Sequence, residues 1–142
     1  MTLLLLDTNV LAYAVGTEHE LRGPARVLLL AAAEGAVQIT TTALVIQEFL
    51  HVRAARRPRA DAVALSRDFA RACDPLLRVE ADDLELGFAL FARDDELDAF
   101  DSLLAAVAIR SGVDALVSAD QAFAAVDGLT WMDLATIDLG GT

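Results

Sequence analysis

Four consecutive leucines followed by an aspartate, Leu3-Leu4-Leu5-Leu6-Asp7, decide the fold. An unbroken apolar run of this length is typical of a strand that is buried on both faces of a parallel sheet. Ligands of such sheets bind beyond the carboxyl ends of the strands, which is where Asp7 stands. The run therefore predicts the first strand of a parallel sheet, with a functional site at its end.

Helical and strand patterns alternate along the rest of the chain. We predict a short helix at 8–14, longer helices at 24–34, 43–57, 60–73, 82–93, 102–111 and 121–126, and strands at 37–41, 76–80, 115–118 and 130–132. Strands that alternate with helices imply right-handed crossovers and a parallel sheet covered on both faces. The sequence thus predicts one domain over residues 1–142, with a three-layer α/β/α fold and a central parallel sheet of four to five strands.

The net charge of the chain limits the kinds of partner that it can bind. The 142 residues carry 22 acidic and 11 basic side chains, for a formal net charge of -11. A chain with this surplus repels polyanions at long range, so its composition disfavours non-specific binding to nucleic acid or to anionic membranes. If the protein acts on phosphates, another source must supply the positive charge.

All the bases are arginine, because the sequence contains no lysine. Walker-type phosphate loops and Schiff-base enzymes are therefore excluded. Cys73 is the one cysteine, so no internal disulfide can form. The apolar run before Asp7 has no basic flank and is too short for a signal peptide, so we expect a cytoplasmic protein with no membrane segment.

Four acids that are distant in sequence are expected at one edge of the sheet. Asp7 ends a strand, Asp101 and Asp120 stand at helix starts, and Glu48 lies among apolar residues, where an uncompensated charge is costly. Aspartate is also a preferred helix cap, so each of the three aspartates could serve only in that way. Asp98, one turn before Asp101, competes with it for the same role.

Carboxylates held close together cannot all stay ionised without a cation. Because all the candidate ligands are oxygens, Mg2+ or Mn2+ is the expected ion. Such an ion activates a water and neutralises a phosphodiester during attack, and it would provide the missing positive charge.

The chain resembles PIN domains and, among them, the VapC-type toxins of bacterial toxin–antitoxin pairs. The resemblance spans nearly the whole chain and rests on four ordered motifs: Leu5-Leu6-Asp7-Thr8-Asn9-Val10, Val45-Ile46-Gln47-Glu48-Phe49, Asp101-Ser102-Leu103-Leu104-Ala105-Ala106-Val107-Ala108, and Leu116-Val117-Ser118-Ala119-Asp120 with Phe123. It implies a Mg2+-dependent endoribonuclease whose catalytic and metal-binding residues are Asp7, Glu48, Asp101 and Asp120. Asn9 and Ser118 are implied as supports of those acids. It also implies a homodimer and a cognate antitoxin that silences the site. Whether all four acids bind metal, or Glu48 or Asp120 mainly positions water, stays open.

Three other functions would also use an acidic edge of this kind. A non-catalytic PIN-like module could bind a partner through its acidic edge, and it would not be stabilised by divalent metal. A metal-dependent DNA 5′-nuclease or a phosphatase would use similar chemistry. However, an aspartyl-phosphate phosphatase would need an aspartate where this chain has Asn9, and usually a lysine.

One local cluster is basic: Arg53, Arg56, Arg57 and Arg59. These arginines could contact an RNA backbone near the metal, or they could simply compensate the dipole at a helix end. We expect Phe49, Leu50, Phe88 and Phe91 to be core or dimer-contact residues rather than platforms for bases, and we expect the same of Trp131 and Tyr13. His51, one turn after Glu48, could assist at the site, but we expect it to be a partly packed helix residue. Cys73 is expected to be a small core residue.

Overall fold

The computed structural model describes residues 1–139. It contains four strands and six α-helices in this part of the chain, together with two short 3-10 helices. In chain order they are β1 Leu3–Leu6, α1 Thr8–Val15, α2 Arg22–Ala33, β2 Gln38–Thr40, α3 Ala43–Ala54, α4 Arg59–Ala72, α5 Ala81–Arg93, α6 Ala99–Ser111, β3 Ala115–Ser118, η1 Gln121–Ala125, β4 Trp131–Asp133 and η2 Leu134–Thr136.

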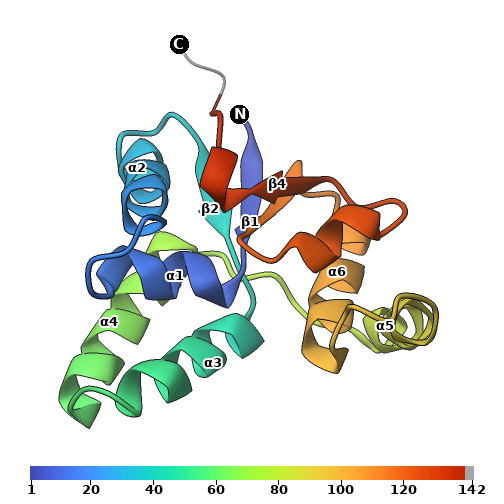
Figure 1. Cartoon of the computed structure of the whole chain (residues 1–142), viewed down its shortest axis with the longest axis horizontal. Helices are drawn as coiled ribbons and strands as arrows, with labels where there is room; N and C mark the ends of the chain where they lie inside the picture. Colours follow the sequence, from blue (N-terminus) through green and yellow to red (C-terminus); the bar gives the residue numbers. More distant parts are fainter. Residues whose placement is uncertain (140–142) are drawn as a thin grey trace.

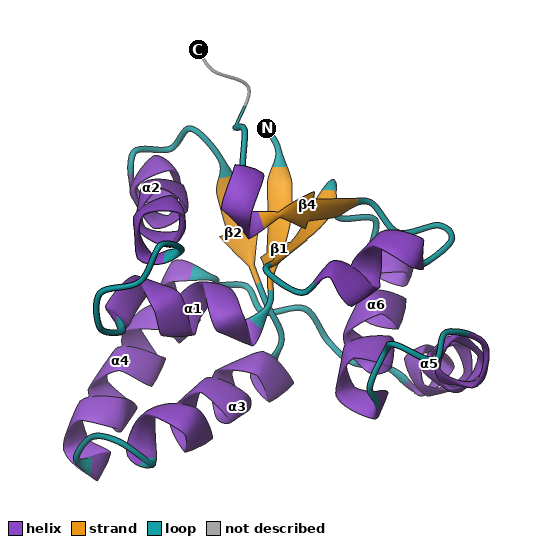
Figure 2. Cartoon of the chain, in the orientation of Figure 1, coloured by secondary structure: helices purple, strands orange, loops and turns teal. Residues whose placement is uncertain are grey.

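The four strands form one parallel sheet in the order β2-β1-β3-β4 (Figures 1 and 2). Leu6 pairs with Val117, so Asp7 and Ser118 follow side by side at the carboxyl ends of the two central strands. The predicted α/β fold with a parallel sheet is confirmed, and the described residues supply four strands.

Helices flank this sheet in two groups, with α1 to α4 gathered to the left of the view and α5 and α6 to the right (Figure 1). The carboxyl ends of the strands point down toward the space between α3 and α6. Within residues 1–139, no helix is both long enough and apolar enough to cross a membrane.

The core forms around the leucines of β1. Leu4, Leu5 and Leu6 are completely buried, as the unbroken apolar run predicts. Three of the six buried residues of helix α6 are alanines, whose small side chains allow close packing. The helix ends at Gly112, whose φ of 70° is the left-handed conformation that glycine tolerates best. Cys73 is a buried core residue as predicted, and burial raises the pKa of its thiol to about 12.

Two predicted elements are wrong. The strand predicted at 76–80 is reduced to one isolated bridge between Leu77 and Thr42. The reason lies in the next residues: the carbonyl of Arg78 accepts a hydrogen bond of 2.7 Å from the Arg110 guanidinium instead of from a strand. The helix predicted at 121–126 is the 3-10 helix η1.

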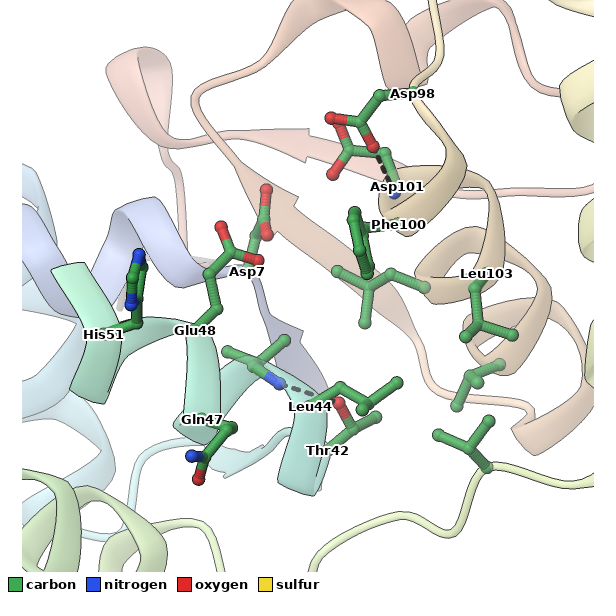
Figure 3. Close-up of a pocket in the computed structure, with 14 residues that line it drawn as sticks. Asp7, Thr42, Leu44, Gln47, Glu48, His51, Asp98, Phe100, Asp101 and Leu103 are labelled. Carbon is green, nitrogen blue, oxygen red and sulfur yellow. Dashed lines mark hydrogen bonds between the residues drawn. The ribbon is translucent and has the colours of Figure 1, made fainter.

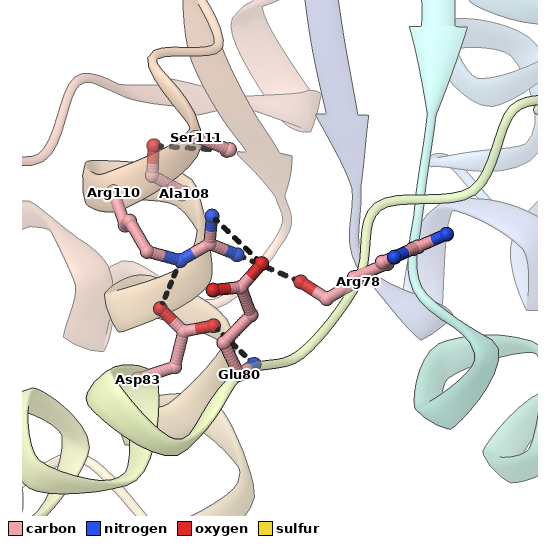
Figure 4. A network of polar contacts seen from close by, with 6 residues as sticks. All are labelled: Arg78, Glu80, Asp83, Ala108, Arg110 and Ser111. Atoms are coloured by element: carbon pink, nitrogen blue, oxygen red, sulfur yellow. Dashed lines mark hydrogen bonds and ion pairs between the residues drawn. The ribbon is translucent and has the colours of Figure 1, made fainter.

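Arg110 is the centre of a polar network that joins α5 to α6 (Figure 4). Its Nε donates to Oδ1 of Asp83 over 2.6 Å, and the other oxygen of Asp83 accepts from the backbone N–H of Glu80 over 2.8 Å. The Asp83 side chain is only 1% exposed. Burial alone would raise the pKa of Asp83, but these two hydrogen bonds and the charge of Arg110 outweigh it and lower the pKa.

Candidate metal centre

Asp7 is held rigidly at the end of β1. It caps α1 through Oδ1, which accepts from the Thr8 N–H over 2.7 Å, so the capping interpretation of this residue is correct. Its Oδ2 accepts from the Ser118 hydroxyl over 2.7 Å and from the Asn9 amide over 3.3 Å. Each carboxylate oxygen can accept about two hydrogen bonds. Oδ1, with one donor, therefore keeps a lone pair for a ligand.

Ser118 connects Asp7 to Asp120. Its hydroxyl, which donates to Asp7, accepts from the Asn9 amide and from the backbone N–H of Asp120, each over 3.0 Å. Asn9 completes the connection, because its Oδ1 accepts from the Ala119 N–H over 3.1 Å. The arrangement places Asn9 and Ser118 where supports of Asp7 would be needed.

Glu48 faces solvent rather than the core. The buried face of α3 is formed by Val45 and Phe49, while Leu44 and Glu48 are exposed. The expected desolvation of Glu48 is therefore wrong, because the helical period splits its apolar neighbours between two faces. In Figure 3, Glu48 points from α3 toward Asp7.

Asp98 and Asp101 have different positions at the start of α6. Asp98 is the helix cap, since its Oδ1 accepts from the Asp101 N–H over 2.7 Å. Asp101 lies in the first turn and is not a cap. Asp120, by contrast, does cap η1, accepting from the Ala122 N–H over 2.9 Å.

The candidate acids line two adjoining cavities. The first, of about 600 Å³, lies between α3 and α6 and contains Asp7, Glu48, Asp98 and Asp101 beside apolar side chains such as Leu44 and Phe100 (Figure 3). The second, of about 500 Å³, contains these four acids and Asp120. Strand ends, the starts of α6 and η1, and the second turn of α3 thus bring together all four predicted acids, with Asp98 as a fifth.

The crowding of these carboxylates changes their electrostatics. Burial raises the pKa of Asp7, and the charges of Glu48 and Asp120 raise it further, against the lowering effect of hydrogen bonds from Ser118 and Thr8. Burial, followed by the charges of the surrounding acids, raises the pKa of Asp101 to about 8. The site therefore favours either a proton or a cation among its acids.

The donor set fits Mg2+ if water completes the coordination. No group of three or more His, Cys, Asp or Glu side chains within residues 1–139 is arranged to hold an ion by itself. Mg2+ commonly keeps several waters and takes only one or two carboxylates from the protein. Thr8 provides a further sign of a ligand. It lines the second cavity, and its buried Oγ1 has no hydrogen-bond partner in the described part of the chain.

The four arginines of the basic cluster do not act together. Arg53 is bound within the fold, donating to Asp61 over 2.7 Å and to the carbonyl of Val15 over 3.0 Å. Arg56 lines the second cavity together with the acids. Arg57 lines only a separate cavity, and Arg59 lines none of those described. Arg56 is thus the member of the cluster placed beside the candidate site.

Four residues at the cavities differ from their predicted roles or were not predicted at all. His51 is exposed in the first cavity rather than partly packed. Thr8, Tyr13 and His19 line the second cavity, and the rings of Tyr13 and His19 stack with centroids 4.5 Å apart. Tyr13 was expected to be a core or dimer-contact residue, whereas Thr8 and His19 were not predicted as site residues. The position of Thr8 directly after Asp7 is the one sequence signal that pointed to either of these two.

A comparison with protein families matches the PIN domain over residues 4–129. The chain is 48% identical over 126 residues to Ribonuclease VapC7 of Mycobacterium tuberculosis, which covers 86% of this chain and 85% of the relative. It is also 36% identical over 124 residues to Ribonuclease VapC23 of the same species, covering 86% and 96% of the two chains.

Solved structures with the same fold are more distant in sequence. VapBC2 from Rickettsia felis, bound to a DNA fragment from its promoter, aligns with a TM-score of 0.73 and 17% identity over 93% of this chain and 98% of that one. Mycobacterium tuberculosis VapC20, a toxin that cleaves the sarcin-ricin loop, aligns with a TM-score of 0.69 and 19% identity, covering 89% and 98%.

Proposed function

The chain belongs to the PIN-domain family and, within it, to the VapC ribonucleases, the toxins of toxin–antitoxin pairs, and from this premise we propose that it hydrolyses RNA with Mg2+ held by its clustered acids. The observation that carries the proposal is that acids from four separate segments line one cavity, and that two of them have raised pKa values. Such a cluster needs a cation to be fully ionised.

The hydrogen bonds and the burial of the four acids support a different proposed role for each in metal binding, proton transfer and the positioning of water. Oδ1 of Asp7 and the carboxylate of Asp101 are the proposed metal ligands, since both lie in the crowded, partly buried part of the site. The side chain of Glu48 is exposed and has no hydrogen bond or ion pair among the described residues, and we propose that it accepts a proton from a water. Asp120 keeps one oxygen free after capping η1 and would position water or metal.

When bound, Mg2+ supplies a water of lowered pKa and a positive charge for the phosphodiester. The chain's own residues then orient the reactants. Ser118 and Asn9 fix the Asp7 carboxylate, and the unpartnered Thr8 hydroxyl is placed to donate to a phosphate oxygen. Mn2+ is expected to substitute for Mg2+, because both prefer oxygen ligands.

The test is cleavage of RNA by the wild-type protein and by Asp7→Asn and Asp101→Asn. We expect cleavage with Mg2+ or Mn2+, none with chelator, and a loss of at least about a hundredfold in each variant, the scale of a general catalytic group. Asp68→Asn is the matched control, because Asp68 is 69% exposed on α4. Cleavage that survives both chelator and Asp7→Asn would contradict the proposal, and cleavage of DNA alone would favour the 5′-nuclease alternative.

A cognate antitoxin is the proposed protein partner. The cavity between α3 and α6 combines acids with the exposed side chains of Leu44, Val79 and Phe100. A segment that carries one basic residue between apolar side chains would complement it, and the net charge of -11 would attract such a segment. Purification together with the protein encoded by the neighbouring gene tests this, and Phe100→Asp should weaken the association.

We place the activity in the cytoplasm, where RNA is available. The single cysteine is consistent with a reducing compartment.

A further inference from the structure

The far end of the second cavity differs in chemistry from the acidic end. There the cavity is lined by Tyr13, Gly16, Thr17, His19 and Arg56, and only one of these side chains is charged. This arrangement could not be predicted from the sequence, because Tyr13 and His19 come from the end of α1 and the following loop, whereas Arg56 follows α3.

His19 is an exposed ring held in a fixed orientation. One face stacks on Tyr13, with an angle of 25° between the ring planes. Its Nδ1 accepts from the backbone N–H of Leu21 over 3.0 Å. The neutral ring therefore carries its proton on Nε2, and that N–H and the outer face of the ring remain available. An aromatic face fixed in advance loses little entropy when a flat ligand stacks on it.

The segment that carries His19 follows a helix end that arginines surround. The carbonyls of Ala14, Val15 and Gly16 accept hydrogen bonds from Arg26, Arg53 and Arg22, respectively. The side chain of Arg56 makes no hydrogen bond or ion pair among the described residues, and its backbone N–H donates to the carbonyl of Arg53 over 3.1 Å. Its guanidinium is therefore free to bind an anion, and the neighbouring arginines offset the acidic charge of the molecule at this end.

We propose that Tyr13, His19 and Arg56 form a nucleotide-binding subsite for single-stranded RNA. The outer face of His19 stacks one base, and Arg56 binds a backbone phosphate, while the adjoining phosphodiester reaches the acids at the other end of the same cavity. A volume of about 500 Å³ is in the range of small-ligand sites. The subsite rests on the proposed ribonuclease function and adds the group that positions the substrate.

The experiment uses a 12-nucleotide single-stranded RNA that contains 2-aminopurine, a fluorescent base whose emission is quenched by stacking. Binding and cleavage are measured with Mg2+ for the wild type, His19→Ala, His19→Phe and Arg56→Gln. Arg67→Gln is the control for charge, since Arg67 is exposed on α4 and lines neither active-site cavity.

We expect His19→Ala to abolish the quenching and to raise KM about tenfold, with little change in kcat, because stacking acts on binding. His19→Phe should restore most of the quenching. Arg56→Gln should raise KM by a similar factor and reduce the salt dependence of binding. Arg67→Gln should change neither the KM nor the salt dependence of binding.

The results separate this subsite from the proposed function. If the wild type cuts RNA and His19→Ala retains both quenching and KM, the subsite is wrong and the ribonuclease stands. If the wild type binds RNA through His19 without cutting it, the subsite stands and the ribonuclease proposal fails. A wild type that neither binds nor cuts this RNA overturns the subsite.

Discussion

Asp101 stabilises the metal-free fold only while it carries a proton. Its pKa is raised from 3.8 to about 8, so the folded state holds a proton that the unfolded chain releases between these values. The stability contributed by Asp101 is therefore complete below about pH 4 and is lost as the pH rises toward 8. The acid that is proposed to bind metal is also a source of strain without it.

Asp101→Asn should remove this loss of stability at high pH. In chelator, we expect the variant to gain on the order of 1 kcal/mol over the wild type at pH 8, about 2–4 °C in Tm, and much less at pH 5. Thermal unfolding at the two pH values measures the difference, with Asp68→Asn as the control. An equal gain at both pH values would show that ionisation of Asp101 is not the cause.

Ser118 and Ser66 give a matched pair of buried hydroxyls. Ser118→Ala would leave the Asn9 amide, the Asp120 N–H and the Asp7 carboxylate each without one partner, at a cost of about 1–3 kcal/mol. The hydroxyl of Ser66 is buried and has no hydrogen-bond partner within residues 1–139, so Ser66→Ala should change stability by less than about 0.5 kcal/mol or increase it. Urea denaturation of both variants tests this, and equal losses would contradict it.

The sequence predicted some site residues much better than others. Asp7, Ser118 and Asp120 could be placed because each lies at or just after the end of an apolar strand run, and parallel strands bring those ends together. The hydrogen bonds that hold the Arg53 side chain to Asp61 and Val15 could not be predicted, since they depend on how α3 packs against α1 and α4. The stack of Tyr13 on His19 likewise depends on the path of a loop.

At the scale of elements, α5 and α6 are held together by close packing and one partly buried ion pair. A Cβ on Gly87 would lie 3.3 Å from the backbone of Leu103, so the two helices approach closely only because residue 87 is glycine. Asp83 and Arg110 add the polar contact (Figure 4). This same network explains why the strand predicted at 76–80 is wrong. Arg110, far along the chain, donates a hydrogen bond to the carbonyl of Arg78, which is then not available to a neighbouring strand.

Asp83→Ala should destabilise the protein by roughly 2 kcal/mol, since it leaves Arg110 and the Glu80 N–H without their partner. The pKa of Asp83 is lowered from 3.8, so its contribution is present above that pH and is lost as the pH falls through the folded-state value. The difference from the wild type should therefore shrink in acid below about pH 4. Asp82→Ala, in the same helical turn, is the control and should stay within about 0.5 kcal/mol.

At the scale of the whole molecule, α5 presents an apolar face to solvent. Leu84, Phe88 and Phe91 are 45%, 60% and 51% exposed and lie one helical turn apart. The prediction that these phenylalanines could be core residues is wrong. The prediction of a dimer contact stays, and we propose that a second copy of the chain covers this face, because exposed apolar stripes of this kind mark interaction surfaces.

Phe88→Glu should therefore convert a dimer into a monomer without unfolding it, because the side chain makes little contact with its own core. Light scattering on a sizing column measures the mass, and circular dichroism checks the fold. Val63→Glu, at an exposed position on α4, should keep the dimer mass. A monomeric wild type, or a dimeric Phe88→Glu, would show that the stripe is not the interface.

The two helix pairs that flank the acids each carry their own arginine–aspartate contact. Arg53 with Asp61 joins α3 to α4, and Arg110 with Asp83 joins α5 to α6. The pairs share no residue and lie on opposite sides of the sheet in Figure 1. Substitutions in the two contacts should then be thermodynamically additive, as expected for distant sites. One side of the acid-lined cavity could accordingly diversify in sequence while the other keeps its stability.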